Sequence, residues 1–471
     1  MLSRRTLLER TAVGFGSLAL ASMLADESSA DTPSANPLAA KPSHFPARAK
    51  RIIFLLMSGG PSQVDTFDPK PLLTRDHGKP FPFAKPRVQF NSTKNLLRSP
   101  WRFRQHGESG LWVSELFPHI ATRADDLCMV HSCYGTNPSH GGAMMKLHTG
   151  SDNFIRPGIG SWVSYGLGTE NANLPAFVTI CPTLAFGGVN NWSSSFLPAV
   201  HNGTALGDAS VPSEKAQMKF IQNSKLPRQI QQLQLDRLNA MNRRHLRRSG
   251  GDASLEARIN SFELAFRMQS SIPQLEDLSR ETPATLKLYG MDDPGTANFG
   301  RMCLLARRFA EAGVRFIQVT HNDDKVQWDQ HNNLKRDHEK NAAEVDLPIA
   351  GLLTDLKQRG MLDDTLVVWG GEFGRTVYCQ GKLTREVYGR DHHPNCFTYW
   401  MAGGGVRGGM TYGETDDYSV NVTENPVHVH DLQATILHQF GIDHERLTYR
   451  YQGRYFRLTD VHGKVVEQIL A

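Results

Sequence analysis

Five short apolar runs constrain the fold of this chain more than any other feature of its 471 residues. Each run is a nearly continuous apolar stretch, which is typical of a strand buried on both faces of a sheet. The runs are residues 51–57, 127–130, 176–180, 314–319 and 365–369. Because each run is preceded or followed by a helical pattern, we predict an α/β fold with a mostly parallel sheet.

Two amphipathic helices are predicted at residues 341–360, which end in a glycine stop, and at residues 431–440. The stretch of about 213–282 differs, because it is polar and helical throughout. We predict that it forms a helical insertion on the sheet. Its basic run, Arg243-Arg244-His245-Leu246-Arg247-Arg248, is either a solvated helix face or a contact for an anionic polymer.

The first thirty residues have the pattern of an export signal. Ser3-Arg4-Arg5-Thr6-Leu7-Leu8 is a twin-arginine pattern, and an apolar run at 12–21 and small residues at 28–30 follow it. An uncleaved N-terminal anchor is the alternative. We predict a signal peptide for the twin-arginine export machinery over 1–30, a linker over 31–48 and one domain over 49–471. The protein is then expected in the periplasm or outside the cell.

The composition narrows the class of protein. With 39% hydrophobic and 21% charged residues, the chain is expected to be a soluble globular protein rather than a multi-span membrane protein, a coiled coil, a collagen or a disordered chain. A net charge of +5 is too small for this length to indicate nucleic acid. The six cysteines would enter an oxidising compartment on export, but their spacing dictates no pairing.

Acidic residues and histidines gather where the predicted strands end. Loops at 62–68, 135–142, 321–331, 370–375, 389–394 and 426–431 all carry Asp, Glu or His. Ligands of an open parallel sheet bind at the carboxyl ends of its strands. Carboxylates and imidazoles are ligands of divalent metals, so these loops predict a site for one or two ions.

Two hydroxyl side chains stand where one strand gives way to a helix. Thr136 and Ser139 both precede a predicted helix, whose N-terminus would favour an anion. Either residue could cap that helix while the other attacks a substrate. An alcohol needs a metal or a base to ionise near neutral pH, so a nucleophilic role depends on the metal site.

Four segments resemble a known family. They are Gly59-Gly60-Pro61-Ser62 through Asp65, Trp328-Asp329-Gln330-His331, Gly371-Glu372-Phe373-Gly374-Arg375 and His428-Val429-His430-Asp431-Leu432. Over about residues 45–470 the chain resembles domain-of-unknown-function family 1501, secreted bacterial proteins within the alkaline phosphatase–sulfatase superfamily. The resemblance implies a three-layer alkaline phosphatase-like core. It also implies Thr136 in the attacking position, and Asp329 and His331 as a metal-binding pair.

The chain departs from the superfamily pattern at three points. Phe373 stands where a histidine ligand is usual, with Glu372 in place of the preceding aspartate and His392 or His393 as substitutes. The usual aspartate directly after the first strand is missing, and Asp65 comes eight residues past Met57. No Cys/Ser-X-Pro-X-Arg segment occurs, which argues against a formylglycine sulfatase.

The leading hypothesis is a secreted, metal-dependent hydrolase of phosphate or sulfate esters, acting on an anionic small molecule or polysaccharide. Thr136 would attack, and Arg375 or Arg390 would bind the anion, unless Arg375 serves only a salt bridge. The expected ligands of one or two zinc, manganese, calcium or magnesium ions are Asp65, Asp329, His331, Glu372, His392 and His393, with His428 and His430 as outer candidates and Asp431 as a helix cap. The alternatives are a non-catalytic envelope or polysaccharide-binding protein and a phosphomutase or transferase.

Overall fold

The computed structural model describes residues 37–84, 95–219, 221, 226–248, 253–321, 327–383 and 387–471. The predicted signal peptide at 1–30 and the first part of the predicted linker lie outside this range. No helix within the described ranges is long and apolar enough to cross a membrane. All six cysteines are described, and each is a buried free thiol.

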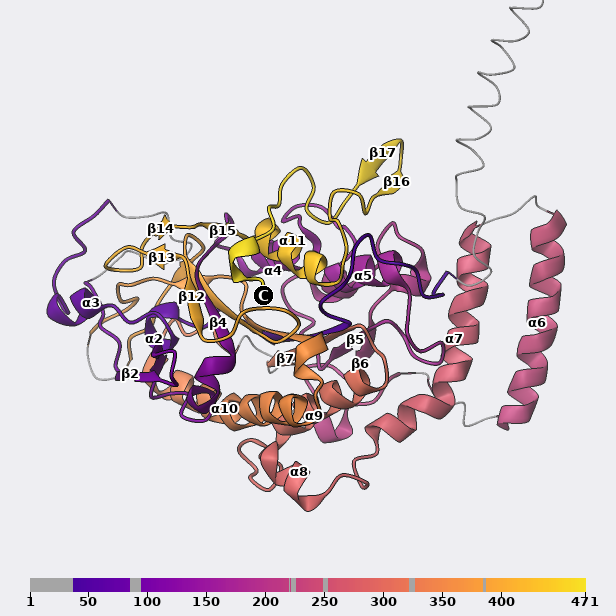
Figure 1. The fold of residues 1–471 in the computed structure, drawn as a ribbon, viewed down its shortest axis with the longest axis horizontal. Coiled ribbons are helices and arrows are strands. Elements are labelled where there is room, and N and C mark those ends of the chain that lie inside the picture. Colours follow the sequence, from indigo (N-terminus) through magenta and orange to yellow (C-terminus); the bar gives the residue numbers. More distant parts are fainter. Residues whose placement is uncertain are drawn as a thin grey trace, which may run out of the picture.

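One nine-stranded sheet forms the centre of the molecule (Figure 1). Its strands lie in the order β12 (Met410–Tyr412), β4 (Leu127–Tyr134), β11 (Phe397–Ala402), β8 (Thr365–Gly370), β1 (Arg51–Met57), β7 (Phe316–His321), β5 (Phe177–Ile180) and β6 (Thr204–Leu206), and β15 (Val427–His428) also pairs with β4. All pairs are parallel except those of β11 with β4 and β8. The five apolar runs are thus β1, β4, β5, β7 and β8, and the predicted α/β class with a mostly parallel sheet is confirmed.

Helices cover both faces of this sheet (Figure 1). Among the described residues the α-helices are α2 (Gln63–Thr66), α3 (Pro71–Arg75), α4 (His140–Thr149), α5 (Ile159–Leu167), α6 (Arg228–Arg248), α7 (Ala253–Glu276), α8 (Pro283–Leu288), α9 (Ala297–Glu311), α10 (Leu334–Gln358) and α11 (Val429–Gln439). The 3-10 turns are Ile120–Asp126, Gly188–Trp192, Ala199–His201, Ser213–Lys215, Leu362–Asp364 and Glu467–Ile469. Helix α10 begins seven residues before its predicted start at 341, and α11 begins two before 431.

Strand β1 shows why the fold has three layers. Ile53 and Leu55 pack into a core that also contains residues of α9 and α10. Ile52 and Phe54 point to the opposite face, where they pack with residues of α4, α5 and α11. A strand buried on both faces needs an apolar residue at every position, which is what the sequence of this run provides.

The remaining strands form two-stranded ribbons outside the central sheet. They are β2 (Phe103–His106) with β3 (Leu111–Ser114), β9 (Gly374–Arg375) with β10 (His392–His393), β13 (Glu414–Thr415) with β14 (Val422–Glu424), and β16 (Tyr449–Tyr451) with β17 (Arg454–Phe456). Within the predicted insertion, α7 packs on the body through Met268 and Ile272, while α6 lies beyond α7 at the edge of the molecule (Figure 1).

Candidate metal centre

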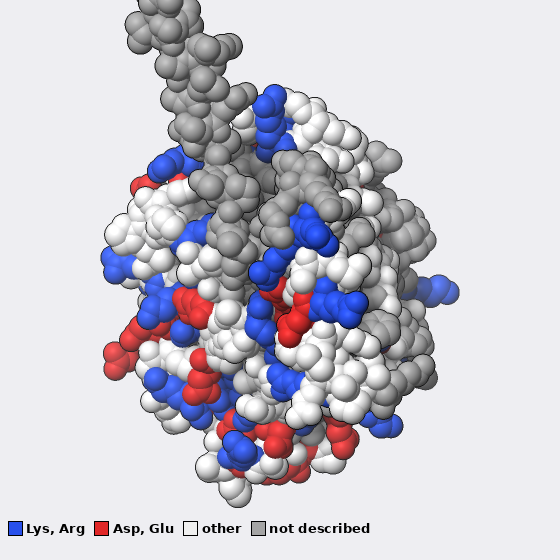
Figure 2. Space-filling view, turned by 90° about the vertical axis from the view of Figure 1, so that its right-hand side faces the viewer, with Lys and Arg blue, Asp and Glu red and all other residues white. Residues whose placement is uncertain are grey.

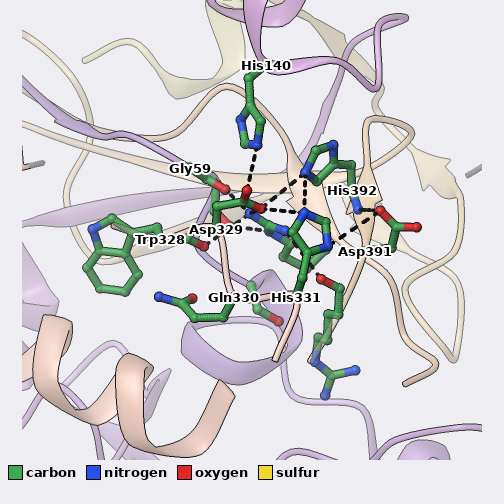
Figure 3. Close-up of polar contacts among 12 residues, drawn as sticks. Gly59, His140, Trp328, Asp329, Gln330, His331, Asp391 and His392 are labelled. Carbon is green, nitrogen blue, oxygen red and sulfur yellow. Dashed lines mark hydrogen bonds and ion pairs between the residues drawn. The ribbon is translucent and has the colours of Figure 1, made fainter. Parts of the chain in front are cut away.

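Asp329 is the centre of a buried polar cluster (Figure 3). Its Oδ2 lies 3.2 Å from Nε2 of His140, and its Oδ1 lies 2.9 Å from Nε2 of His331 and 3.1 Å from Nε2 of His392. Arg375 Nη2 is 2.6 Å from the same Oδ1. Burial alone would raise the pKa of Asp329, but the charge of Arg375 and the three histidines hold it well below its usual range. Asp329 is therefore a carboxylate.

The parallel sheet explains how distant residues meet here. His140 is the first residue of α4, directly after the loop that follows β4. Asp329 and His331 follow β7, and His392 lies on β10, which pairs with β9 just beyond the end of β8. Because β4, β7 and β8 run in the same direction, their carboxyl ends share one edge of the sheet.

Each of the three imidazole rings is oriented by an acceptor at Nδ1. These acceptors are Glu372 Oε1 for His140 at 2.6 Å, the Pro138 carbonyl for His392 at 2.6 Å, and Gln380 Oε1 for His331. Carboxylate, carbonyl and amide oxygens only accept, so each Nδ1 carries the hydrogen. In the neutral rings every Nε2 then presents a lone pair toward Asp329. A second acceptor that fixes the tautomer in this way is usual for metal-binding histidines.

The protonation of the rings differs with their surroundings. Burial, together with the positive charge of Arg375, lowers the pKa of His392 to about 4 despite the nearby Asp329. Burial acts in the same direction on His140, but its bonds to Asp329 and Glu372 outweigh that effect and raise its pKa. His392 is thus neutral near pH 7 and can donate its Nε2 lone pair.

The donor set fits a divalent cation. Two groups, His140 with Asp329 and His392, and His331 with Asp391 and His392, each place their ligand atoms within 4.8 Å of one another. Within the described part of the chain, Asp391 Oδ2 is buried without a hydrogen-bond partner. The carboxylates of the cluster are Asp329, Asp391 and Glu372, and its only arginine among the described residues is Arg375. A divalent cation would balance the excess negative charge.

Two of the expected ligands, Asp65 and His393, lie outside these candidate groups. Asp65 forms a bidentate pair with Arg390, at 2.7 and 3.1 Å, and both side chains are fully buried. His393 points its Nε2 at the Val420 carbonyl, 2.7 Å away. Neither belongs to the two groups above. The candidate ligand set is therefore revised to His140, Asp329, His331, Asp391 and His392.

Glu372 belongs to neither of the two candidate ligand groups and instead contacts the far side of the His140 ring. One carboxylate oxygen binds His140, and both accept the backbone N–H of Gly59, at 3.0 and 3.1 Å. It orients a ring and ties the end of β1 to the end of β8. Phe373 follows, and its ring stacks on His392 with centroids 4.5 Å apart. The phenyl group thus lies directly beside the cluster.

The two arginines expected to bind an anion are bound within the protein. The guanidinium of Arg375 donates to the carbonyls of Gly59, Gly60 and Trp328 in addition to Asp329. That of Arg390 donates to the carbonyls of Leu97 and Thr376 in addition to Asp65. Both side chains are 1% exposed or less. They hold the loops of the cluster together and are not available to a substrate.

The outer candidates, His428 and His430, have structural partners. His428 caps α11 in a capping box with Asp431, as predicted for the latter residue. His430 Nε2 lies 2.9 Å from the Gly150 carbonyl. Burial is the main cause that lowers the pKa of each ring to about 4. Among the described residues, neither belongs to a group that could hold a metal.

Thr136 lies in the exposed loop between β4 and α4, four residues before His140. Ser139 takes the N-cap position of α4, but its side chain makes no capping hydrogen bond. Sequence reasoning missed His140, Asp391 and Gln380 as members of the site. The first two stand in strand-end loops that already carried the metal prediction, so their position alone could have included them.

The fold and the cluster together define a three-layer α/β protein with a histidine–aspartate site at the carboxyl edge of its sheet. The chain belongs to the family described as "Protein of unknown function (DUF1501)", which matches residues 49–470. This confirms the family that the sequence resembles. No curated protein matches the chain.

Several solved structures are similar in fold. The lipoteichoic acid synthase of Listeria monocytogenes is 10% identical, with 89% of this chain and 78% of that chain covered and a TM-score of 0.35. A sulfatase from Pseudoalteromonas is 12% identical, with 90% and 72% covered and a TM-score of 0.38. A protein of the alkaline phosphatase superfamily from Vibrio parahaemolyticus is 9% identical, with 88% and 72% covered and a TM-score of 0.35. None of these similarities is strong enough to assign an activity.

Proposed function

We propose that this protein is a metal-dependent hydrolase of phosphate or sulfate esters that holds one divalent cation among His140, Asp329, His331, Asp391 and His392. The observation that supports it most is the convergence of three Nε2 atoms on Asp329, each ring fixed by an acceptor at Nδ1. Both candidate groups use His392, whose Nδ1 faces Pro138, so they are alternative positions for a single ion.

Lewis acidity toward an ester oxygen and toward a nearby hydroxyl is the chemistry that such an ion supplies when bound. The chain supplies the positioning. Glu372 and Gln380 fix the rings of His140 and His331, while Arg375 anchors Asp329. The N-terminus of α4 begins at His140, so its partial positive charge lies beside the cluster and would favour an anionic ester there.

Thr136 is the nucleophile in this proposal. Thr136 is exposed and so accessible to a substrate, and its loop contains Pro138 and leads directly to His140, both of which contact the cluster. The hydroxyl oxygen would attack phosphorus or sulfur and form a Thr136 ester, while its proton would go to the leaving alcohol. Water would then hydrolyse that ester, which restores the hydroxyl and releases phosphate or sulfate. An anionic small molecule or polysaccharide ester is the proposed substrate, and export through the twin-arginine pathway remains part of the proposal.

Paired hydroxyl variants test this role. Thr136→Ala should lower turnover of p-nitrophenyl phosphate or p-nitrophenyl sulfate by about 100-fold or more while the metal content is unchanged. Ser139→Ala is the matched control in the same loop and should keep most of the activity, since that hydroxyl makes no capping bond. Full activity in Thr136→Ala, or loss in Ser139→Ala alone, would remove Thr136 from the mechanism.

A binding protein without turnover is the second candidate, and Phe373 is the observation that favours it. Its ring lies against both His392 and His140, with centroids 4.5 and 4.8 Å away, and narrows access to the cluster from that side. Such a protein would retain the metal and bind an anionic ester or polysaccharide. Tight binding of phosphate or sulfate monoesters with no product formed would favour this candidate.

A further inference from the structure

The face of helix α6 that packs on α7 is mainly polar, whereas an ordinary surface helix packs an apolar face on the protein. The side chains that are buried or half-buried along it are Gln231, Leu235, Asn239 and Asn242. Their spacing of four, four and three residues defines the face that packs on α7. Three of these four residues carry an amide, so the inner face of α6 is mainly polar.

The contacts between α6 and α7 are also mainly polar. Gln269 donates to Gln231 at 3.0 Å, and Asn239 donates to Glu263 at 2.8 Å. Arg243 forms an ion pair with Glu263 at 3.5 Å. A groove of about 730 Å³ opens between the two helices beside Leu235 and Phe266. Helix α6 is therefore attached by a few polar contacts and little close apolar packing.

Four large apolar residues of α6 point away from α7. Their exposed fractions are 43% for Ile230, 64% for Leu233, 44% for Leu238 and 63% for Met241. At 100° per residue these four positions span a stripe about 140° wide, and Arg237 and Arg244 project within it. We call this stripe the outer face of α6. Isolated exposed apolar residues need no explanation, but four on one face of one helix indicate a contact surface.

Positive charge accompanies the outer face. Helix α6 contains six arginines and a single acidic residue, Asp236. Arg237 and Arg244 are exposed and lie within about one turn of Leu233, Leu238 or Met241 in the sequence. Figure 2 shows the side of the molecule on which α6 lies, where blue Lys and Arg side chains occur together with red Asp and Glu side chains. The arginines are interleaved with the apolar residues of this face, and their long side chains can extend to lipid phosphates while the apolar groups enter a membrane surface.

We propose that the outer face of α6 docks on an anionic lipid surface. Leu233 and Met241 would enter the boundary between headgroups and acyl chains, and the arginines would meet the lipid phosphates. Pairing with a second copy would place this basic helix against another basic helix, with only Asp236 to compensate. A soluble anionic polysaccharide would match the arginines but would leave the apolar stripe in water.

Vesicle cosedimentation of the full chain tests this proposal. Vesicles of phosphatidylcholine with one quarter phosphatidylglycerol should bind the protein, and vesicles of pure phosphatidylcholine should bind it at least tenfold more weakly. Leu233→Ser/Met241→Ser and, separately, Arg237→Gln/Arg244→Gln should each lower partitioning by about tenfold or more. Raising salt from 0.1 to 1 M shortens the screening length from about 10 to 3 Å and should weaken the wild type in the same direction.

Val461→Ser is the matched control, because Val461 is 72% exposed and lies outside α6. It should bind like the wild type, and circular dichroism should show unchanged helix content in all variants. Residues 12–21 are present in every variant, so a difference between variants belongs to α6. Equal binding by wild type and both α6 variants would overturn the proposal. So would a wild-type dimer in sedimentation equilibrium that Leu233→Ser/Met241→Ser converts to a monomer.

Discussion

The Nε2 atoms of His331 and His392 lie 3.1 Å apart, and both face Oδ1 of Asp329. Since each ring has its hydrogen-bond acceptor at Nδ1, the neutral rings direct two lone pairs and a carboxylate oxygen at one another. Such an arrangement is stable only with a proton or a cation in between. The excess of carboxylates over arginine around it favours a divalent cation.

His392 is the ligand common to both candidate groups, so its loss should weaken metal binding most. We predict that His392→Ala lowers the affinity for zinc or manganese by about 100-fold or more. His393→Ala is the matched control, because the neighbouring ring faces the Val420 carbonyl, and should bind within about threefold of the wild type. Isothermal titration of the metal-depleted proteins measures both. Equal losses in the two variants would contradict the revised ligand set.

Asp65 should matter for stability and not for metal binding. Its pair with Arg390 has no solvent exposure on either side, and removal of one partner leaves a buried charge unmatched. Asp65→Asn is expected to lower the free energy of unfolding by about 3–5 kcal/mol while the metal stoichiometry stays the same. Urea denaturation and metal analysis check the two parts. Loss of metal from a folded Asp65→Asn protein would restore Asp65 as a ligand.

The sequence predicted the sheet better than the site. The run Ile52 to Met57 indicates a strand through local chemistry alone, because every position must be apolar when both faces are covered. Strand β11 was not predicted, although Phe397–Ala402 is fully buried. Its position between β4 and β8, with which it pairs, depends on tertiary structure. Asp329, His331 and His392 were found because strand-end loops meet at one edge of the sheet.

The sequence could not predict the directions in which the side chains of the candidate ligands point. His392 and His393 are adjacent on β10, and successive residues of a strand point to opposite faces, so only one of them reaches Asp329. Asp65 lies eight residues after the end of β1, and its carboxylate pairs with the buried guanidinium of Arg390. Pairing with Arg390, fifteen residues after Arg375, depends on the return of the chain at β9 and β10.

Gly59 should be intolerant of a side chain. Its φ is +112°, and an added Cβ would lie 2.6 Å from the Asp329 nitrogen. Gly78 also has a positive φ, +82°, but nothing lies within 4 Å of its added Cβ. Gly78→Ala should therefore cost about 1 kcal/mol through backbone strain, and Gly59→Ala at least about 3 kcal/mol with weaker metal binding. Thermal denaturation with bound metal measures the difference, and equal costs would show that the contact with residue 329 is unimportant.

His201 should make the fold sensitive to acid. It is 2% exposed, and burial, with a smaller effect from Lys41, lowers its pKa to about 3. The unfolded chain takes up this proton near its ordinary pKa, so the stabilisation is complete above about pH 6.5 and is lost as pH falls toward 3. Between pH 6.5 and 4.5 this residue alone should remove about 2 kcal/mol from the free energy of unfolding.

A variant isolates that contribution. His201→Asn retains a polar group for the hydroxyl of Ser164, which lies 2.9 Å from Nδ1 in the native protein, and should show a shallower pH dependence of urea stability. His119→Asn, at an exposed position, should leave the slope as it is. If the free energy of unfolding fell equally steeply with pH in the wild type and in His201→Asn, another group would govern acid unfolding.

Metal content per chain tests the central claim most directly. Protein purified without chelators or a histidine tag should contain about one equivalent of a divalent ion by plasma mass spectrometry. His392→Ala should contain far less, and His393→Ala should match the wild type. A folded wild-type protein that holds no zinc, manganese, magnesium or calcium, even after reconstitution with each ion, would contradict the metal centre and with it the proposed hydrolase.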